Sequence, residues 1–152
     1  GTEYGLCVGR YQMAGPHALS GRCYCGDIAV SVQLSGAAER YSPRACDCDF
    51  CRLHGASYLS DPKGQLRFTV QSGAVLNRYR QGAEEADMLL CGRCGVLMGA
   101  CYERDGSCYG TVNAAVLPPV FAAPQPVSPK QLSADEKTRR WMLLWFPDVG
   151  IG

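Results

Sequence analysis

Three groups of cysteines are the residues of this chain most able to do chemistry. In chain order they are Cys23 and Cys25; Cys46, Cys48 and Cys51; and Cys91 and Cys94. The chain has ten cysteines in 152 residues, and a domain of that size buries a hydrophobic core without disulfides to hold it together. In a reducing compartment, closely spaced cysteines are typical of metal sites or redox groups. The spacing therefore predicts metal binding.

The first and third groups supply two cysteines each, and zinc in its closed, structural form is bound by four ligands in a tetrahedron. We therefore expect one structural zinc on these two pairs, with two disulfides or four free core thiols as the alternatives. The four ligands are Cys23, Cys25, Cys91 and Cys94. Such a metal would pin an early strand to a later hairpin. Gly26, Gly92 and Gly95 lie beside these cysteines and suit tight turns around a metal.

The middle group, Cys46, Cys48 and Cys51, has no evident fourth ligand. Three protein ligands and one open position are the pattern of a catalytic zinc, and thiolates favour zinc over magnesium or calcium. We therefore predict a second, catalytic zinc here, which gives two zincs per chain. His54 is the nearest side chain that would close the site and make it inert, although a lone nearby histidine is more often a neighbour of the ligands.

Other side chains near the middle group have less defined roles. Asp47 and Asp49 are further candidate ligands, and with His54 they are candidate proton carriers. Arg52 directly follows Cys51, so it would hold the carboxylate of an anionic substrate beside the second metal, or lie in solvent as an ordinary surface arginine. Buried free thiols act as small apolar side chains, and we expect that role for the cysteines outside the groups. These are Cys7, Cys101 and Cys108.

Short strands with glycine turns must position these groups. Residues 27–34 alternate between apolar and polar side chains, which predicts a half-buried strand. Residues 66–70 and 74–79 predict strands around a turn at Ser72-Gly73. Further short apolar runs occupy residues 88–90, 96–98 and 108–112. Together these segments favour a mainly β fold.

The remaining segments are less regular. Residues 43–55 are rich in cysteine and too irregular to predict a regular element. Residues 118–129 carry five prolines, which exclude a helix and disfavour a central strand, so we expect an extended wrap over the surface.

The C-terminal part carries a helix signal. Ser133 followed by Glu136 is the signature of a capping box and predicts a short helix that runs to about Leu144. Trp141 and Trp145 are spaced i, i+4, which predicts one packed helix face and not a ligand platform. We therefore divide the chain into three parts: a flexible lead-in (1–20), a zinc-binding domain (21–117), and a proline-rich wrap with a C-terminal segment (118–152).

Charge and hydropathy exclude some function classes. The net charge is +1, from 15 basic and 14 acidic side chains, with no basic stripe. This argues against binding to nucleic acid or to a membrane surface. The apolar runs are too short to span a membrane, and the first residues do not read as a signal peptide. We expect a cytoplasmic protein with small-molecule partners and leave open a homodimer.

Taken in order, the three cysteine groups resemble those of the glutathione-dependent formaldehyde-activating enzyme family, which also includes centromere protein V. The residues that carry the resemblance are Gly21-x-Cys23-x-Cys25-Gly26, Cys46-x-Cys48-x-x-Cys51-Arg52-x-x-Gly55 and Cys91-x-x-Cys94-Gly95. The resemblance spans about residues 21–117. It implies a β-tent fold of stacked antiparallel sheets built around a structural zinc. It also implies the same two zinc ligand sets and the condensation of formaldehyde with glutathione to S-hydroxymethylglutathione, a carbon–sulfur lyase reaction in reverse.

An enzyme of this kind would bind a thiol at the open zinc, lower its pKa and let the thiolate attack a small aldehyde. Polarisation of the aldehyde by zinc is the alternative, but three thiolates leave the site negatively charged and weaken that effect. A rival function is a non-enzymatic, zinc-stabilised binding or chaperone-like module, which predicts a closed or metal-free middle group and a large exposed apolar patch. A nucleic-acid role predicts a basic extension, which the charge pattern does not support.

Overall fold

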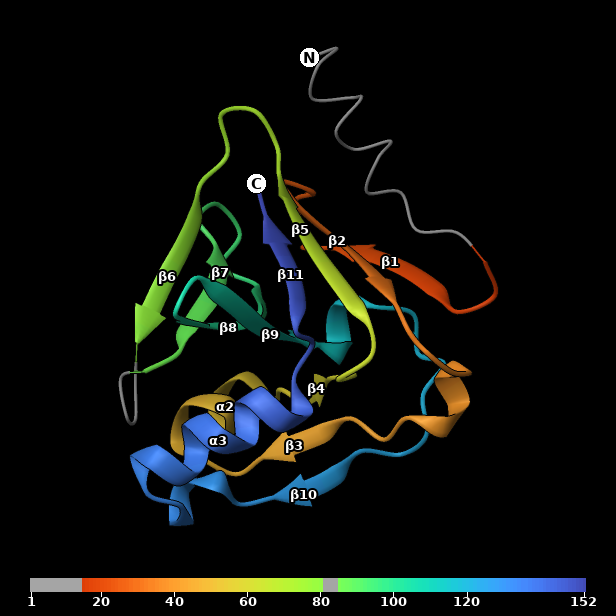
Figure 1. Cartoon of the computed structure of the whole chain (residues 1–152). Helices are drawn as coiled ribbons and strands as arrows, with labels where there is room; N and C mark the ends of the chain where they lie inside the picture. The colour runs from red at the N-terminus through yellow and green to blue at the C-terminus, as the bar shows by residue number, and fades with distance from the viewer. Residues whose placement is uncertain (1–14, 81–84) are drawn as a thin grey trace.

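A computed structural model describes residues 15–80 and 85–152 of the protein. These residues form a mainly β fold of two sheets with helices on one side, as Figure 1 shows. The predicted fold class is therefore confirmed. Cys7, which we expect to be a buried thiol, lies outside the described residues. No helix within the two described ranges is both long and apolar enough to cross a membrane.

The first sheet has four strands in the order β1-β2-β5-β11. These strands are β1 (Ala18–Arg22), β2 (Ile28–Gln33), β5 (Gln65–Val70) and β11 (Asp148–Ile151). Strand β2 is the predicted alternating strand, since Ile28, Val30 and Val32 are buried and their neighbours are not. Ordered strand structure begins before the predicted zinc-binding domain, because β1 starts at Ala18 and pairs with β2.

The second sheet has seven strands in the order β10-β3-β4-β9-β8-β7-β6. They are β3 (Arg44–Cys46), β4 (Tyr58–Leu59), β6 (Leu76–Arg80), β7 (Asp87–Cys91), β8 (Leu97–Arg104), β9 (Ser107–Asn113) and β10 (Gln125–Val127). The proline-rich segment supplies β10 at one edge, where a missing N–H is tolerated. One pair in each sheet departs from the expected antiparallel arrangement. Strand β10 runs parallel to β3, and β11 runs parallel to β5.

Strands β5 and β6 both form, but they belong to different sheets. The turn between them contains Gly73 at φ 82°, a backbone conformation that glycine adopts without strain. In Figure 1 the two strands leave their connecting loop and diverge. This turn therefore carries the chain from one layer to the next and does not close a hairpin.

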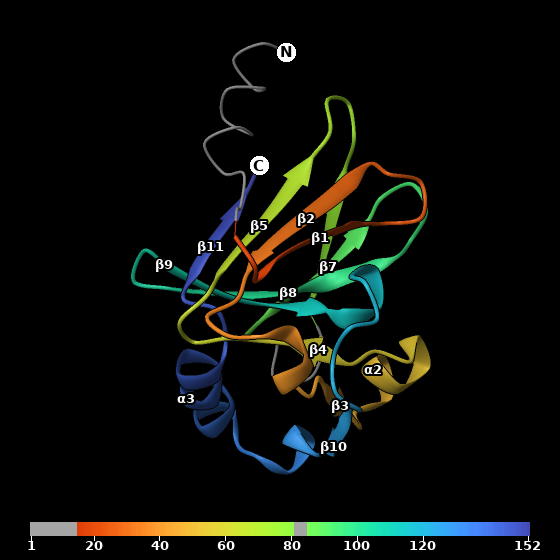
Figure 2. The ribbon, with the colours of Figure 1, turned by 90° about the vertical axis from the view of Figure 1, so that its right-hand side faces the viewer.

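The molecule has three layers, which Figure 2 shows from the side. Strands β7, β8 and β9 lie between the four-stranded sheet and the two helices. Strand β8 is buried on both faces: Met98 and Cys101 pack in the core toward the four-stranded sheet, and Ala100 and Tyr102 pack in a second core toward the helices. Gly99 lets the layers approach, since a Cβ there would lie 3.2 Å from the ring of Phe68.

The two α-helices within the described residues are α2 (Asp49–His54) and α3 (Ala134–Leu144). The predicted capping box of α3 is confirmed by hydrogen bonds in both directions between Ser133 and Glu136, at 2.8 and 3.1 Å. The expectation that residues 43–55 lack regular structure was wrong, because they contain β3 and α2. A three-residue strand and a six-residue helix are too short to leave a periodic pattern in the sequence.

Candidate metal centres and the adjoining cavity

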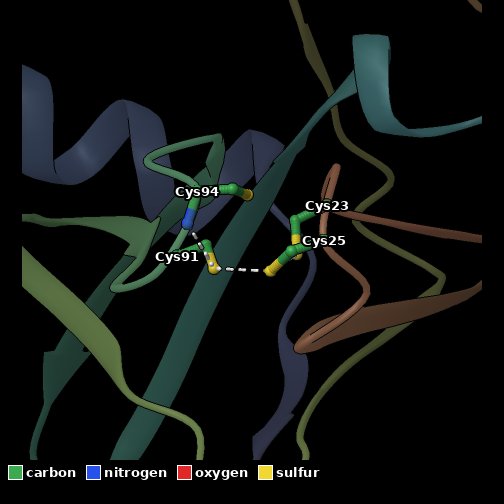
Figure 3. A group of neighbouring side chains, drawn as sticks. All are labelled: Cys23, Cys25, Cys91 and Cys94. Atoms are coloured by element: carbon green, nitrogen blue, oxygen red, sulfur yellow. Dashed lines mark hydrogen bonds between the residues drawn. The ribbon is translucent and has the colours of Figure 1, made fainter.

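The first and third cysteine groups meet between the two sheets. Cys23 and Cys25 lie in the turn between β1 and β2, while Cys91 ends β7 and Cys94 lies in the turn that leads to β8. Figure 3 shows the four side chains facing one another from these two turns. Their sulfur atoms all lie within 4.8 Å of one another. The two hairpins, one from each sheet, are thus brought together by their thiols.

The spacing of these thiols fits a tetrahedral metal. The Sγ atoms of Cys23 and Cys25 are 3.7 Å apart, and those of Cys25 and Cys91 are 3.6 Å apart. Zn–S bonds of about 2.3 Å in a tetrahedron hold their sulfurs roughly 3.8 Å apart. No disulfide joins any of the cysteines that the structure describes. The backbone N–H of Ile28 donates to Cys23 Sγ, at 3.3 Å.

The turns that carry these cysteines depend on glycine. Gly26 and Gly95 adopt φ angles of 87° and 79°. Gly92 lies against Val75, and a Cβ there would lie 2.8 Å from the carbonyl oxygen of that residue. In the second turn the backbone N–H groups of Arg93 and Cys94 donate to Cys91 Sγ, at 3.3 and 3.4 Å. The predicted tight turns are therefore confirmed, and the second one cradles a sulfur atom.

The four thiols do not ionise alike. Burial raises the pKa of Cys94, but hydrogen bonds from the backbone of Cys25 and Val96 outweigh it and lower this pKa to about 6. For Cys25, a backbone hydrogen bond from Asp27 lowers the pKa. Desolvation and the neighbouring thiols outweigh that bond and raise this pKa to about 12. Four negative charges at this spacing repel one another, so a divalent cation is what allows all four to ionise.

The middle group gathers at the junction of β3 and α2. Cys46 ends β3, Cys48 is the N-cap residue of α2, and Cys51 is buried inside that helix. Their sulfur atoms lie within 4.8 Å of one another. The Sγ of Cys48 accepts a hydrogen bond from the backbone N–H of Cys51, at 3.4 Å. Among the described histidine, cysteine and acidic residues, no fourth one joins the group.

The candidate fourth ligands lie elsewhere. His54 is exposed at the end of α2, and its ring packs against Phe50 with centroids 4.6 Å apart. Asp49 is exposed as well and pairs with Arg52 at 3.3 Å. An oxygen of Asp47 lies 4.0 Å from the ammonium of Lys130. None of the three candidates is part of the thiol cluster.

A cavity of about 170 Å³ opens beside the middle group. The three cysteines and Tyr58 line one part of it, and an apolar wall includes Met88, Ala100, Trp141 and Trp145. Four basic side chains complete the lining: Arg44, Lys130, Lys137 and Arg140. The four-cysteine cluster does not border this cavity.

The cation that the sequence suggested for this site does not line the cavity. Arg52 is not among the lining residues, and its side chain is 66% exposed. It directly follows Cys51 in a helix, where successive side chains point about 100° apart, so one faces the cavity and the other faces solvent. Arg44 was the missed candidate: it stands two residues before Cys46 on β3, and alternate residues of a strand share a face.

A family model described as glutathione-dependent formaldehyde-activating enzyme matches residues 18–131. The chain belongs to this family. The matched range contains all seven cysteines of the two clusters and ends before α3 begins. No curated protein matches the chain. A crystal structure of a Rhodobacter sphaeroides protein is similar, with 23% identity over 88% of this chain and 99% of the other and a TM-score of 0.49.

In this family member two of the four cavity cations lack acidic partners. Arg44 and Arg140 form no ion pair with any acidic side chain in the described part of the chain. The Nη2 atom of Arg44 is buried and makes no hydrogen bond. Burial, followed by the nearby charge of Arg140, lowers the pKa of Arg44. The cavity therefore presents positive charge that an anionic ligand would balance.

The thiols of the middle group are also electrostatically unequal. A hydrogen bond from Cys51 lowers the pKa of Cys46 to about 6, although burial opposes the shift. The same hydrogen bond, together with burial, raises the pKa of Cys51. Burial and the charge of Cys51 raise the pKa of Tyr58, whose hydroxyl lies 3.0 Å from Cys51 Sγ. Tyr58 thus stays protonated and able to donate a hydrogen bond to that sulfur. The donor set fits zinc with one open position.

Proposed function

We propose that this chain is a zinc-dependent enzyme that condenses a small aldehyde with a thiol such as glutathione, in the manner of an S-(hydroxymethyl)glutathione synthase, a carbon–sulfur lyase. One observation carries the proposal: within a chain of this family, a three-thiol cluster opens onto a cavity that holds basic side chains without acidic partners. A reaction site needs an open coordination position and room for a substrate, and only the middle group has both.

The ligand assignment is part of this proposal. The four converging thiols of Cys23, Cys25, Cys91 and Cys94 hold a structural zinc. The thiols of Cys46, Cys48 and Cys51 hold the catalytic zinc. When bound there, zinc would lower the pKa of a substrate thiol that binds to it. The reducing cytoplasm is the compartment that suits two thiolate clusters.

The residues of the cavity bind and orient the substrates. Arg44 and Arg140 attract the carboxylates of an anionic thiol, the role that sequence adjacency assigned to Arg52. Tyr58 donates its hydroxyl hydrogen bond to Cys51 Sγ and keeps that sulfur in place. The apolar wall with Met88 and Trp145 limits access of water to the reacting atoms.

The condensation itself is balanced without a redox partner. The substrate thiol gives its proton to solvent, and its sulfur forms a new bond to the aldehyde carbon. The π electrons of the carbonyl move to its oxygen, which takes a proton from solvent and becomes a hydroxyl group. The alternative, a non-enzymatic binding module, predicts a closed middle group, and the cavity beside these three thiols argues against it.

The test is the rate at which aldehyde exchanges with its thiol adduct, because the two condense slowly without a catalyst. With carbon-13 formaldehyde and glutathione, magnetisation-transfer NMR measures this exchange directly. We expect zinc-loaded wild type to accelerate exchange and Cys46→Ser to return it to the solution rate. Cys108→Ser is the matched control, since Cys108 lies outside both clusters, and it keeps the wild-type rate. Exchange at the solution rate with fully zinc-loaded wild type would refute the proposal.

A further inference from the structure

The recognition side of the cavity comes from a part of the chain that the family model does not cover. The match ends at residue 131, and α3 begins at Ala134. Four lining residues lie beyond the match: Lys137, Arg140, Trp141 and Trp145. The thiols that do the chemistry all lie inside it. The reactive centre is therefore shared with the family, while part of the surface that meets the substrate comes from residues outside the matched region.

Helix α3 is held firmly enough to act as a wall. At its start, Ser133 and Glu136 form the capping box. After its end, Phe146 is fully buried and exchanges two backbone hydrogen bonds with Gly110 of β9, at 2.9 and 2.8 Å. The chain then continues into β11, which pairs with β5. Both ends of the helix are thus fixed to the sheets, so its cavity face has a defined position.

The apolar part of this face is flat and aromatic. The rings of Trp141 and Trp145 are stacked, with centroids 5.0 Å apart and planes 20° apart. The ring of Tyr102 meets Trp141 edge-on at 5.3 Å. The prediction that the two tryptophans only pack together was therefore incomplete, since both also line the cavity. Formaldehyde would cover only a small part of such a wall, whereas a flat aromatic group would bury its whole face against it.

The charged part of the same cavity calls for an anion. The buried Nη2 of Arg44 makes no hydrogen bond, and Arg140 adds a second positive charge to the lining of the same cavity. Lys137 lies one helical turn before Trp141 and also lines the cavity. Like charges placed together in a partly buried site repel each other unless a ligand of opposite charge binds. Basic groups beside an aromatic wall therefore match a ligand that has both an anionic group and an aromatic ring.

We propose that the cavity selects an aryl carboxylate, a ligand that joins a flat aromatic ring to an anionic group, and that this ligand carries the reacting thiol or aldehyde. The proposal names the substrate class of the condensation proposed above and rests on it for turnover. The carbon–sulfur bond forms and the protons move as described there. Arg44 and Arg140 bind the carboxylate, and Trp141 contacts the ring.

Binding is tested first, with ligands that cannot react. Benzoate has both features, acetate has only the anion, and benzyl alcohol has only the ring. We expect calorimetric titration of the zinc-loaded protein to give benzoate an affinity about tenfold or more above that of either partial ligand, since each feature adds its own contact. Because both tryptophans of the chain line the cavity, their fluorescence also reports acetate binding independently.

Matched variants on α3 separate recognition from stability. Arg140→Gln removes the benzoate preference over benzyl alcohol, while Arg139→Gln, at the neighbouring exposed position, keeps it. Trp141→Leu removes the preference over acetate, while Leu143→Ala, whose side chain is exposed, keeps it. Equal affinity of the wild type for benzoate and acetate would overturn the proposal, as would equal losses in Arg140→Gln and Arg139→Gln.

Turnover then identifies which reactant carries the ring. One mixture contains 4-mercaptobenzoate and formaldehyde, and the other contains glutathione and 4-formylbenzoate. Acceleration of either exchange above that of glutathione with formaldehyde supports the substrate class. If benzoate binds selectively but no mixture is accelerated, the proposed function fails and the binding site stands. If only glutathione with formaldehyde is accelerated and benzoate shows no preference, the proposed function stands and this inference fails.

Discussion

The two thiol clusters differ in what they join. The four-thiol cluster links turns from two sheets, and two of its neighbouring sulfurs belong to residues 66 positions apart. The three-thiol cluster lies within six consecutive positions at one strand–helix junction, and it faces a cavity. A metal in the first closes a long loop of chain, whereas a metal in the second closes almost none. In the proposed function, the same ligand type therefore serves stability in one cluster and chemistry in the other.

The two clusters also differ in what surrounds them. Backbone N–H groups of Ile28, Arg93 and Cys94 donate to sulfurs of the four-thiol cluster, and they complete a closed shell. The three-thiol cluster contacts Tyr58 and, together with it, lines the cavity. Ligand number alone separates a structural site from a catalytic one, but the neighbouring space decides whether the open position can be used.

The largest expected effect is on stability. Cys91→Ser should lower the free energy of unfolding by more than about 4 kcal/mol, because it removes a metal that joins the two sheets. For a chain of this size, such a loss of free energy corresponds to a fall in Tm of roughly 10 °C or more. Cys46→Ser should cost much less, since its cluster joins no distant segments. Thermal unfolding followed by circular dichroism measures both, with Cys108→Ser as control. Equal losses in Cys91→Ser and Cys46→Ser would remove the distinction between the clusters.

A smaller effect is expected from graded removal of metal. A three-ligand site holds zinc less tightly than a four-ligand one, so a chelator should remove one equivalent first. The circular dichroism spectrum should stay unchanged at that stage, while the exchange activity disappears. Removal of the second equivalent should unfold the chain. Zinc release is followed with a colorimetric indicator, and release of both equivalents in one step would contradict the comparison.

The smallest effect should come from Tyr58→Phe, which deletes the hydroxyl group 3.0 Å from Cys51 Sγ. Loss of one hydrogen bond to a charged sulfur weakens the cluster by about 1–3 kcal/mol. In cobalt-substituted protein, the sulfur-to-metal charge-transfer absorption of the middle site should shift. Tyr109→Phe is a suitable control, because Tyr109 does not line the cavity. An unchanged spectrum in Tyr58→Phe would show that the hydroxyl does not act on the ligand.

Features determined by local sequence were predictable. The spacing of the cysteines identified both thiol clusters, and Ser133 with Glu136 identified the start of α3. Strand β2 followed from alternation alone. Each of these signals depends on residues that are neighbours in the chain, and counting four ligands paired the two distant motifs of the four-thiol cluster.

Features that depend on tertiary packing were not predictable. Arg44 and Arg140 lie 96 positions apart, and only the docking of α3 brings them to one cavity. Strand β11 has four residues and no alternation strong enough to predict it. The turn at Gly73 is compatible with a hairpin or with a change of sheet, and the sequence does not distinguish them. All three features are determined by the packing between layers.

Because α3 follows both thiol clusters in the sequence, the cluster ligands are synthesised before the cavity is complete. All four residues of the closed cluster have been synthesised once Cys94 is added, but the cavity waits for Trp145, 51 positions later. Under the proposed ligand assignment, the ligands of the structural zinc are therefore present in a nascent chain before the residues that complete the cavity. The thiols of the middle group gain their cover only after α3 has been synthesised.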